Sequence, residues 1–130
     1  MRDIVRPSLH FTPQKGWIND PNGLVFLKDK YHLFYQYNPY HDNWDSMHWG
    51  HAVSRDLIHW EELEPALVPD MPYDNDKNGG CFSGSVVVHD DQLFLFYTGR
   101  TEGETGIFET QNLAVSKDGR HFVKAERKPA

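Results

Sequence analysis

Hydrophobic residues in this chain occur in short runs that are separated by polar turn sequences. Such runs occupy positions 23–27, 31–35 and 49–53 in the first half and positions 85–88, 93–97 and 113–115 in the second half. The intervening Lys-Asp, Asp-Asp and Lys-Asp-Gly sequences are typical of tight turns between strands. No segment of helical length keeps an apolar period of about 3.6 residues. The pattern therefore predicts an all-β chain.

The two halves of the chain repeat each other. Phe34 matches Phe96, and Trp60 matches Phe122, in each case 62 positions later. The same spacing relates the two Ala-Val-Ser sequences that lie between these pairs. Each repeat contains about four strand-like segments, which is the make-up of one β-propeller blade. We place blade one at about residues 17–63 and blade two at about residues 80–126.

Two blades do not close a propeller, because a ring needs about four to eight of them. The chain, residues 1–130, is therefore expected to be a partial N-terminal propeller domain. Two alternatives are assembly with other chains through the exposed flanks of the blades, and a fold that is propeller-like only in part. Truncation is the preferred interpretation.

Composition and charge narrow the choice of partner. The chain is 38% hydrophobic and 14% aromatic, which is enough for a core. A net charge of -6 without a Lys/Arg cluster argues against nucleic acid and anionic membranes as partners. The single cysteine, Cys81, forms no internal disulfide, and no apolar leader or membrane span is recognisable, so a cytoplasmic location is expected. A neutral or weakly charged ligand suits these properties.

The most unusual local sequence is Trp-Ile-Asn-Asp-Pro-Asn-Gly at residues 17–23, just before the first apolar run. Its structural interpretation is a tight turn, because Pro fixes φ and Asn-Gly accepts positive φ. Its functional interpretation is a sugar site, because it places the Asp20 carboxylate beside Trp17 and Asn19 at the entrance to a strand. An aromatic ring would stack on the sugar, and the amide would bind its hydroxyl groups.

Five sequences, in this order, resemble motifs of the invertase, sucrose-6-phosphate hydrolase and fructan-hydrolase family, glycoside hydrolase family 32. They are Trp-Ile-Asn-Asp-Pro-Asn-Gly at 17–23, Phe-Tyr-Gln-Tyr-Asn-Pro at 34–39, His-Trp-Gly-His-Ala at 48–52, Asp-Leu-Ile-His-Trp at 56–60 and Cys-Phe-Ser-Gly-Ser at 81–85. The resemblance extends from about Arg6 to Lys124, and five linked motifs are far more specific than one.

This resemblance implies a five-bladed propeller, of which the chain holds only the first two four-stranded blades. The later blades and the C-terminal β-sandwich of the family would be absent. The family cleaves β-fructosides with retention of configuration, and Asp20 falls on the position of its nucleophile. In such a mechanism a second carboxyl, about 5 to 5.5 Å away, protonates the leaving oxygen and later activates water. The implied partner is a fructose-containing sugar: sucrose, sucrose 6-phosphate or a fructan.

The resemblance also implies a set of sugar-binding residues. Asn19 and Gln36 would hold sugar hydroxyl groups, although Gln36 has the alternative of an inter-blade hydrogen bond. Trp44 and Trp17 would supply aromatic faces, with the alternative that both are core residues. Phe82 and Ser83 would belong to a loop that packs against the sugar. Apart from the resemblance, Glu102 and Glu104 are placed in a glycine-rich loop between strands, as further candidates for the rim of the pocket.

Other candidate chemistry is weaker. His48 and His51 lie three positions apart on an expected strand and so point to opposite faces, which argues against a metal site, and no cofactor is expected. The Arg-Asp-Pro motif of the family and its Glu-Cys acid/base motif do not occur in the sequence. The chain alone is therefore expected to be inactive or nearly so. The competing hypotheses are a sugar-binding or self-assembling two-blade module without catalysis, and a folded remnant without function.

Overall fold

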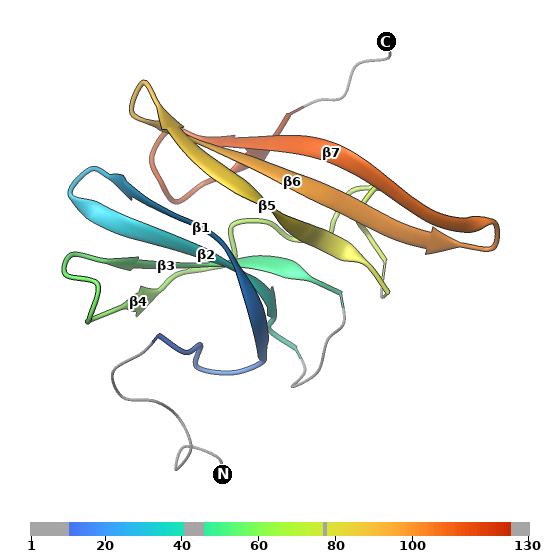
Figure 1. Cartoon of the computed structure of the whole chain (residues 1–130), viewed down its shortest axis with the longest axis horizontal. Helices are drawn as coiled ribbons and strands as arrows, with labels where there is room; N and C mark the ends of the chain where they lie inside the picture. The colour runs from blue at the N-terminus through green and yellow to red at the C-terminus, as the bar shows by residue number, and fades with distance from the viewer. Residues whose placement is uncertain (1–10, 41–45, 77, 126–130) are drawn as a thin grey trace.

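Two four-stranded antiparallel sheets make up the computed structural model, which describes residues 11–40, 46–76 and 78–125 (Figure 1). The first sheet contains β1 (Trp17–Leu27), β2 (Lys30–Asn38), β3 (His48–Ser54) and β4 (Glu61–Glu62). The second contains β5 (Gly80–His89), β6 (Gln92–Gly103), β7 (Gly106–Ser116) and β8 (Val123–Lys124). In both sheets the strands follow chain order, as in a propeller blade. The all-β prediction and the prediction of two four-stranded blades are confirmed.

The first turn of each sheet is a tight hairpin. Lys28 and Asp29 join β1 to β2 with φ values of 51° and 66°, and Asp90 and Asp91 join β5 to β6 with φ values of 51° and 59°. Two successive residues with positive φ form the turn whose twist matches that of the flanking strands.

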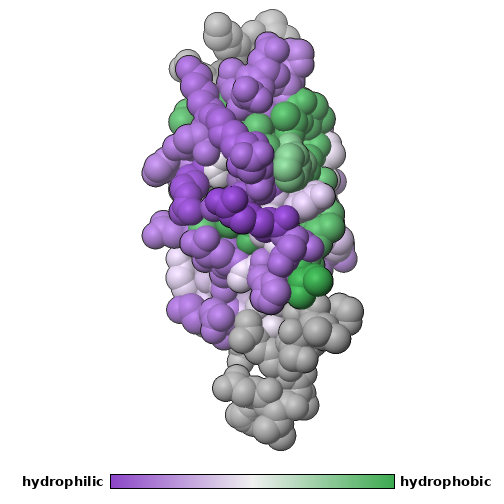
Figure 2. Space-filling view, turned by 90° about the vertical axis from the view of Figure 1, so that its left-hand side faces the viewer, coloured by the Kyte–Doolittle hydropathy of each residue, from purple (hydrophilic) through white to green (hydrophobic). Residues whose placement is uncertain are grey.

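These turns lie at one end of the molecule. The described surface at that end is largely hydrophilic, with hydrophobic side chains gathered toward one edge (Figure 2).

The third turn of each sheet is held by an aspartate. Asp56 accepts hydrogen bonds from the main-chain N–H of His59 at 2.8 Å and from its ring at 2.6 Å. Asp118 does the same for His121, at 2.8 Å and 2.5 Å. These bonds stabilise the charged carboxylates and lower the pKa of both aspartates. The shared turn chemistry explains why the two halves of the sequence match here.

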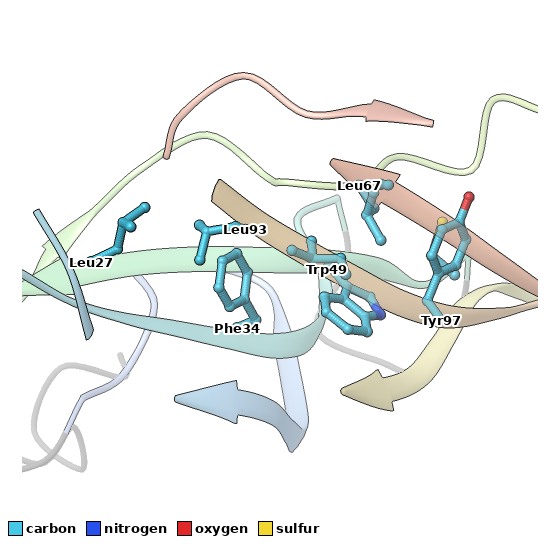
Figure 3. Packing of buried hydrophobic residues seen from close by; sticks show 9 residues of the cluster. Leu27, Phe34, Trp49, Leu67, Leu93 and Tyr97 are labelled. Atoms are coloured by element: carbon cyan, nitrogen blue, oxygen red, sulfur yellow. The ribbon is translucent and has the colours of Figure 1, made fainter. Parts of the chain in front are cut away.

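The main core lies between the two sheets (Figure 3). Side chains alternate between the two faces of a strand, so every second residue of β2 and β6 points into this layer. Phe34 of β2 meets Phe122 edge to face at a centroid distance of 5.8 Å, and Trp49 of β3 meets Tyr97 of β6 at 6.3 Å. The labelled side chains of this layer are Leu27, Phe34, Trp49, Leu67, Leu93 and Tyr97.

A second cluster covers the other face of the first sheet. Tyr35, Tyr37 and Ala52 are buried there, and Phe11 packs on Tyr35 at a centroid distance of 5.0 Å. Trp60 completes this cluster. The sheet β1–β4 is therefore covered on both sides.

The hairpin formed by β6 and β7 is longer than its apolar runs predict. The two strands pair continuously from Leu93 with Ser116 to Gly103 with Gly106. Residues 98–111 include many polar and glycine residues, so the apolar pattern ends although the main-chain pairing continues. The prediction that Glu102 and Glu104 share a loop is wrong for Glu102, which belongs to β6.

No helix that could span a membrane is found in the part of the chain that the structure describes.

Candidate functional site

Asp20 lies inside β1, where the strand is bulged. Ile18 pairs with Tyr37, Pro21 with Tyr35 and Gly23 with Phe34, so the register shifts on both sides of Pro21. The sequence interpretation of a turn before the strand is therefore wrong: the motif belongs to the strand. A bulge re-aims side chains, and proline is tolerated on an edge strand, where one side of the main chain has no partner to lose. The result is an exposed Asp20 carboxylate.

Trp17 and Asn19 are joined beside this carboxylate. The Trp17 Nε1–H donates a hydrogen bond to Oδ1 of Asn19 at 3.0 Å. This contact fixes the indole and leaves the Asn19 side chain exposed next to Asp20. Trp17 is half-buried and is a member of neither apolar cluster of the described residues. Both side chains lie on β1, the strand that carries Asp20.

Phe82 and Ser83 occupy the corresponding part of the second sheet. β5 also carries a register shift, between Phe82 and Gly84. A Cβ on Gly84 would lie 1.7 Å from the carbonyl oxygen of Phe96, so this bulge requires glycine. Ser83 is exposed, and Phe82 is half-buried.

β1 and β5 lie side by side, so the two bulges occur on neighbouring strands (Figure 1). Glycine again makes the approach possible, because a Cβ on Gly23 would lie 2.6 Å from Cγ2 of Val86. The structure thus places the Asp20 segment and the Phe82 segment at corresponding positions of adjacent strands.

Two side chains of the first sheet hold the start of β5 in place. Gln36 is buried, and its Nε2–H donates to the carbonyl oxygen of Cys81 at 2.9 Å. Trp49 is also buried, and its Nε1–H donates to the carbonyl oxygen of Phe82 at 2.8 Å. Gln36 therefore makes the inter-sheet hydrogen bond that was its alternative role. It lies opposite the bulge of β1 and connects that bulge to β5.

A charged cluster with one buried carboxylate, Asp74, and one exposed carboxylate, Asp70, lies next to Cys81. The Lys124 ammonium donates to Asp74 at 2.9 Å and to Asp70 at 2.7 Å, and Cys81 Sγ lies 3.7 Å from Asp74. Burial opposes the Lys124 charge, but Cys81 and the two carboxylates outweigh burial and raise the pKa of Lys124. Burial raises the pKa of the Cys81 thiol, as expected for a packed residue without thiolate reactivity. These contacts connect β8 to Asp70 and Asp74, which lie in the part of the chain that links β4 to β5.

Trp44, the remaining predicted sugar-binding residue, lies outside the described residues. Sequence reasoning missed Arg100, whose guanidinium lies 5.3 Å from the centroid of the Phe82 ring and donates to the carbonyl oxygen of Asn78 at 2.5 Å. It also missed the position of Asn22, which is 6% exposed. The Asn22 amide has no hydrogen-bond partner among the described residues. The only available signal for Asn22 was its place in the same motif as Asp20.

Potential metal ligands are not clustered in the described ranges, where no group of three or more His, Cys, Asp or Glu residues is arranged to hold an ion. The chemistry available at the two bulges is instead that of one exposed carboxylate with aromatic, amide and hydroxyl neighbours. This combination suits attack on a neutral polar substrate such as a sugar.

Relatives of known name share this sequence and fold. Residues 10–130 match the N-terminal domain of glycosyl hydrolases family 32. The chain is 52% identical over 122 residues to a sucrose-6-phosphate hydrolase of Zymomonas mobilis, covering 91% of this chain and 23% of the relative. It is 45% identical over 132 residues to the levanase of Bacillus subtilis, covering 95% of this chain and 19% of the relative.

A solved structure agrees with these sequence matches. The family 32 beta-fructofuranosidase of Bombyx mori superposes with a TM-score of 0.84 at 48% identity, over 95% of this chain and 26% of that one. A mutant of the same enzyme was solved in complex with sucrose. The chain therefore spans about a quarter of the length of these relatives. Since the family model covers nearly all of its length, the chain belongs to glycosyl hydrolase family 32.

Proposed function

We propose that this chain supplies the nucleophile side of a retaining β-fructosidase active site. The observation that carries the proposal is the exposed Asp20 carboxylate on a doubly bulged strand, next to Trp17 and Asn19. Relatives named sucrose-6-phosphate hydrolase, levanase and beta-fructofuranosidase support fructosides as the substrate class.

In the proposed reaction Asp20 attacks the anomeric carbon of the fructosyl group. The Asp20 side chain is exposed on β1, so a substrate can approach its carboxylate. As the bond to Asp20 forms, the bond from the anomeric carbon to the leaving-group oxygen breaks, and that oxygen takes a proton from an acid outside these 130 residues. Water then attacks the anomeric carbon of the covalent fructosyl-enzyme, gives up a proton to the same group, and releases fructose with retained configuration and Asp20 as the free carboxylate. Trp17 would present an aromatic face to the sugar, Asn19 would bind a hydroxyl group, and Ser83 would donate a hydroxyl from the neighbouring strand.

The same proposal assigns no leaving-group acid to these 130 residues. The Glu-Cys motif that the resemblance associates with the acid/base is absent from the sequence, as is Arg-Asp-Pro. General acid catalysis is typically worth about 10² to 10⁴-fold in rate. We therefore expect the chain alone to release little or no fructose, and we expect activity when the rest of a family catalytic domain is joined to it.

A chimera tests this proposal. Residues 10–130 replace the matching segment of the Zymomonas mobilis hydrolase, and fructose release is measured with sucrose and sucrose 6-phosphate. We expect the chimera to be active and Asp20→Asn to lower kcat at least about 10³-fold, because the nucleophile is lost.

Asp29→Asn is the matched control for this chimera. Asp29 is an exposed carboxylate in the β1–β2 turn, and Asn tolerates its positive φ. An Asp20→Asn chimera as active as the Asp29→Asn chimera would refute the assignment of the nucleophile.

A further inference from the structure

The Phe82 ring belongs to the candidate site and lies outside the apolar core. Phe82 is half-buried and is a member of neither apolar cluster of the described residues. Its main chain is fixed, because its carbonyl oxygen accepts a hydrogen bond from Trp49 Nε1–H at 2.8 Å. The register of β5 shifts directly after it, between Phe82 and Gly84. Core packing therefore does not set the direction of this ring.

Strand pairing brings the Arg100 side chain to the ring. Thr98 of β6 is the cross-strand partner of Phe82, and Arg100 is the partner of Gly80. Residues two apart on a strand share a face, so Phe82 and Arg100 are diagonal neighbours, a separation that aromatic and long side chains can bridge. Gly80 has no side chain opposite Arg100, which leaves room for the guanidinium to lie over the Phe82 ring. The guanidinium carbon is 5.3 Å from the ring centroid.

The Arg100 guanidinium is itself held in place. One of its nitrogens donates to the carbonyl oxygen of Asn78 at 2.5 Å, and the other lies 3.9 Å from the Glu102 carboxylate. Asp76 accepts the main-chain N–H of Asn78 at 2.9 Å and that of Glu102 at 2.5 Å, so it ties the segment before β5 to β6. The Arg100 side chain is only 17% exposed. A fixed cation therefore covers the Phe82 ring.

We infer that Arg100 is a positioning residue for sugar binding that acts through the Phe82 ring. This inference rests on the proposed function, because it takes Phe82 as a residue that contacts the sugar. A cation over the face of an aromatic ring attracts it, so Arg100 holds the ring in one orientation. A ring that is already in place loses less conformational freedom when the sugar binds. Lysine is a poor substitute, because it lacks the planar group that stacks and donates at once.

The chimera described above tests this role of Arg100. Arg100→Met keeps a long side chain but removes the charge and the N–H donors. We expect KM for sucrose to rise at least about fivefold and kcat to change less than about twofold, because the ring contacts the sugar before and during the reaction. Arg100→Lys should give a smaller rise in KM, because it restores the charge. Urea unfolding would verify that each variant is folded.

Arg120→Met is the matched control. Arg120 lies in the turn between β7 and β8 and, like Arg100, has a nitrogen 3.9 Å from a glutamate carboxylate, that of Glu61. Its substitution removes the same charge and the same donors at a place that has no contact with Phe82 among the described residues. KM should stay that of the unmodified chimera.

A double-mutant cycle separates an effect through the ring from a general loosening of the structure. Phe82→Leu alone should raise KM, because it removes the aromatic face. If Arg100 acts through that ring, Arg100→Met should raise KM no further in the Phe82→Leu chimera. If the chimera releases no fructose, sucrose binding measured by isothermal titration calorimetry gives the same cycle on Kd.

Three results would overturn the inference: an unchanged KM in folded Arg100→Met, an equal rise in KM with and without the Phe82 ring, or a rise confined to sucrose 6-phosphate. The last result would mean that the guanidinium contacts the phosphate directly. The Asp20→Asn chimera tests the nucleophile separately through kcat. Failure of the nucleophile assignment is therefore distinguishable from failure of the role of Arg100, which is measured by KM.

Discussion

Among single residues, buried polar side chains at the boundary of the two sheets matter most for the candidate site. Gln36 and Trp49 donate to consecutive carbonyl groups at the start of β5. Each bond satisfies a carbonyl that would otherwise lose its contact with water, and an unsatisfied buried partner typically costs about 1–3 kcal/mol. The same bonds hold the main chain of Cys81 and Phe82 against the first sheet. Specific hydrogen bonds, in addition to apolar packing, thus determine the geometry of the site.

His32 and His51 form a second buried polar contact at this boundary. Their ring nitrogens, Nδ1 of His32 and Nε2 of His51, lie 2.9 Å apart. His51 also stacks on Phe34 at a centroid distance of 4.5 Å. Burial, and then the charges of His32 and Arg120, lower the pKa of His51 from 6.5 to about 3. The ring is therefore neutral in the folded protein at neutral pH.

His51 makes the stability of the folded chain depend on pH. Between pH 6.5 and 3 the unfolded chain binds a proton at His51 that the folded chain does not, so stability falls as pH falls. His51→Leu copies the equivalent residue, Leu113, and removes this linkage. We expect the loss of unfolding free energy between about pH 6.5 and 4.5 to shrink by about 2 kcal/mol in the variant. Urea unfolding at the two pH values measures it.

The control for this measurement is the exposed His89. His89→Gln should leave the pH dependence of the unmodified protein unchanged. An equal pH dependence in His51→Leu and in the unmodified chain would show that His51 does not carry the effect.

At the scale of strands, the bulges of β1 and β5 determine where the candidate residues point. Both occur at corresponding positions of the repeat, and both are accompanied by a glycine that lets another main chain or strand approach closely. In a regular strand, side chains would alternate between faces, and the residues flanking the bulges would be aimed differently. The direction of the Asp20 side chain therefore depends on the bulge in β1.

A glycine substitution tests the bulge of β5. A Cβ on Gly84 would lie 1.7 Å from the Phe96 carbonyl oxygen, so Gly84→Ala must displace main chain. We expect a loss of at least about 2 kcal/mol in unfolding free energy. Gly103→Ala is the control, because its Cβ would meet only Phe108 at 3.8 Å. Similar stabilities of the two variants in urea unfolding would contradict this role of the bulge.

The sequence predicted strands and their repeat well, because tight turns and apolar runs are local features. It placed the Trp-Ile-Asn-Asp-Pro-Asn-Gly motif in a turn, because turn and bulge use the same residues. Only pairing with β2 distinguishes them, and that pairing involves residues 34–38. Arg100 was missed for a similar reason: its contact with Phe82 depends on pairing within a hairpin whose apolar pattern has already ended. Sequence patterns therefore did not predict the contacts between segments that lie far apart in the chain.

At the scale of the whole molecule, the chain is two adjacent blade-like sheets of a family in which the relatives compared above are about four times as long. The first sheet is covered on both faces, and the second is covered on one. The proposed nucleophile is present, whereas the motifs that the resemblance links to the acid/base and to transition-state stabilisation are not. We therefore propose Asp20 as the attacking group of a site that other residues complete.

Mass spectrometry of the chimera after rapid acid quenching on sucrose tests that claim most directly. We expect a peptide containing residues 17–23 that carries one fructosyl group on Asp20, and no such peptide in the Asp20→Asn chimera. A fructosyl group on another carboxylate, or hydrolysis that continues in the Asp20→Asn chimera, would contradict it.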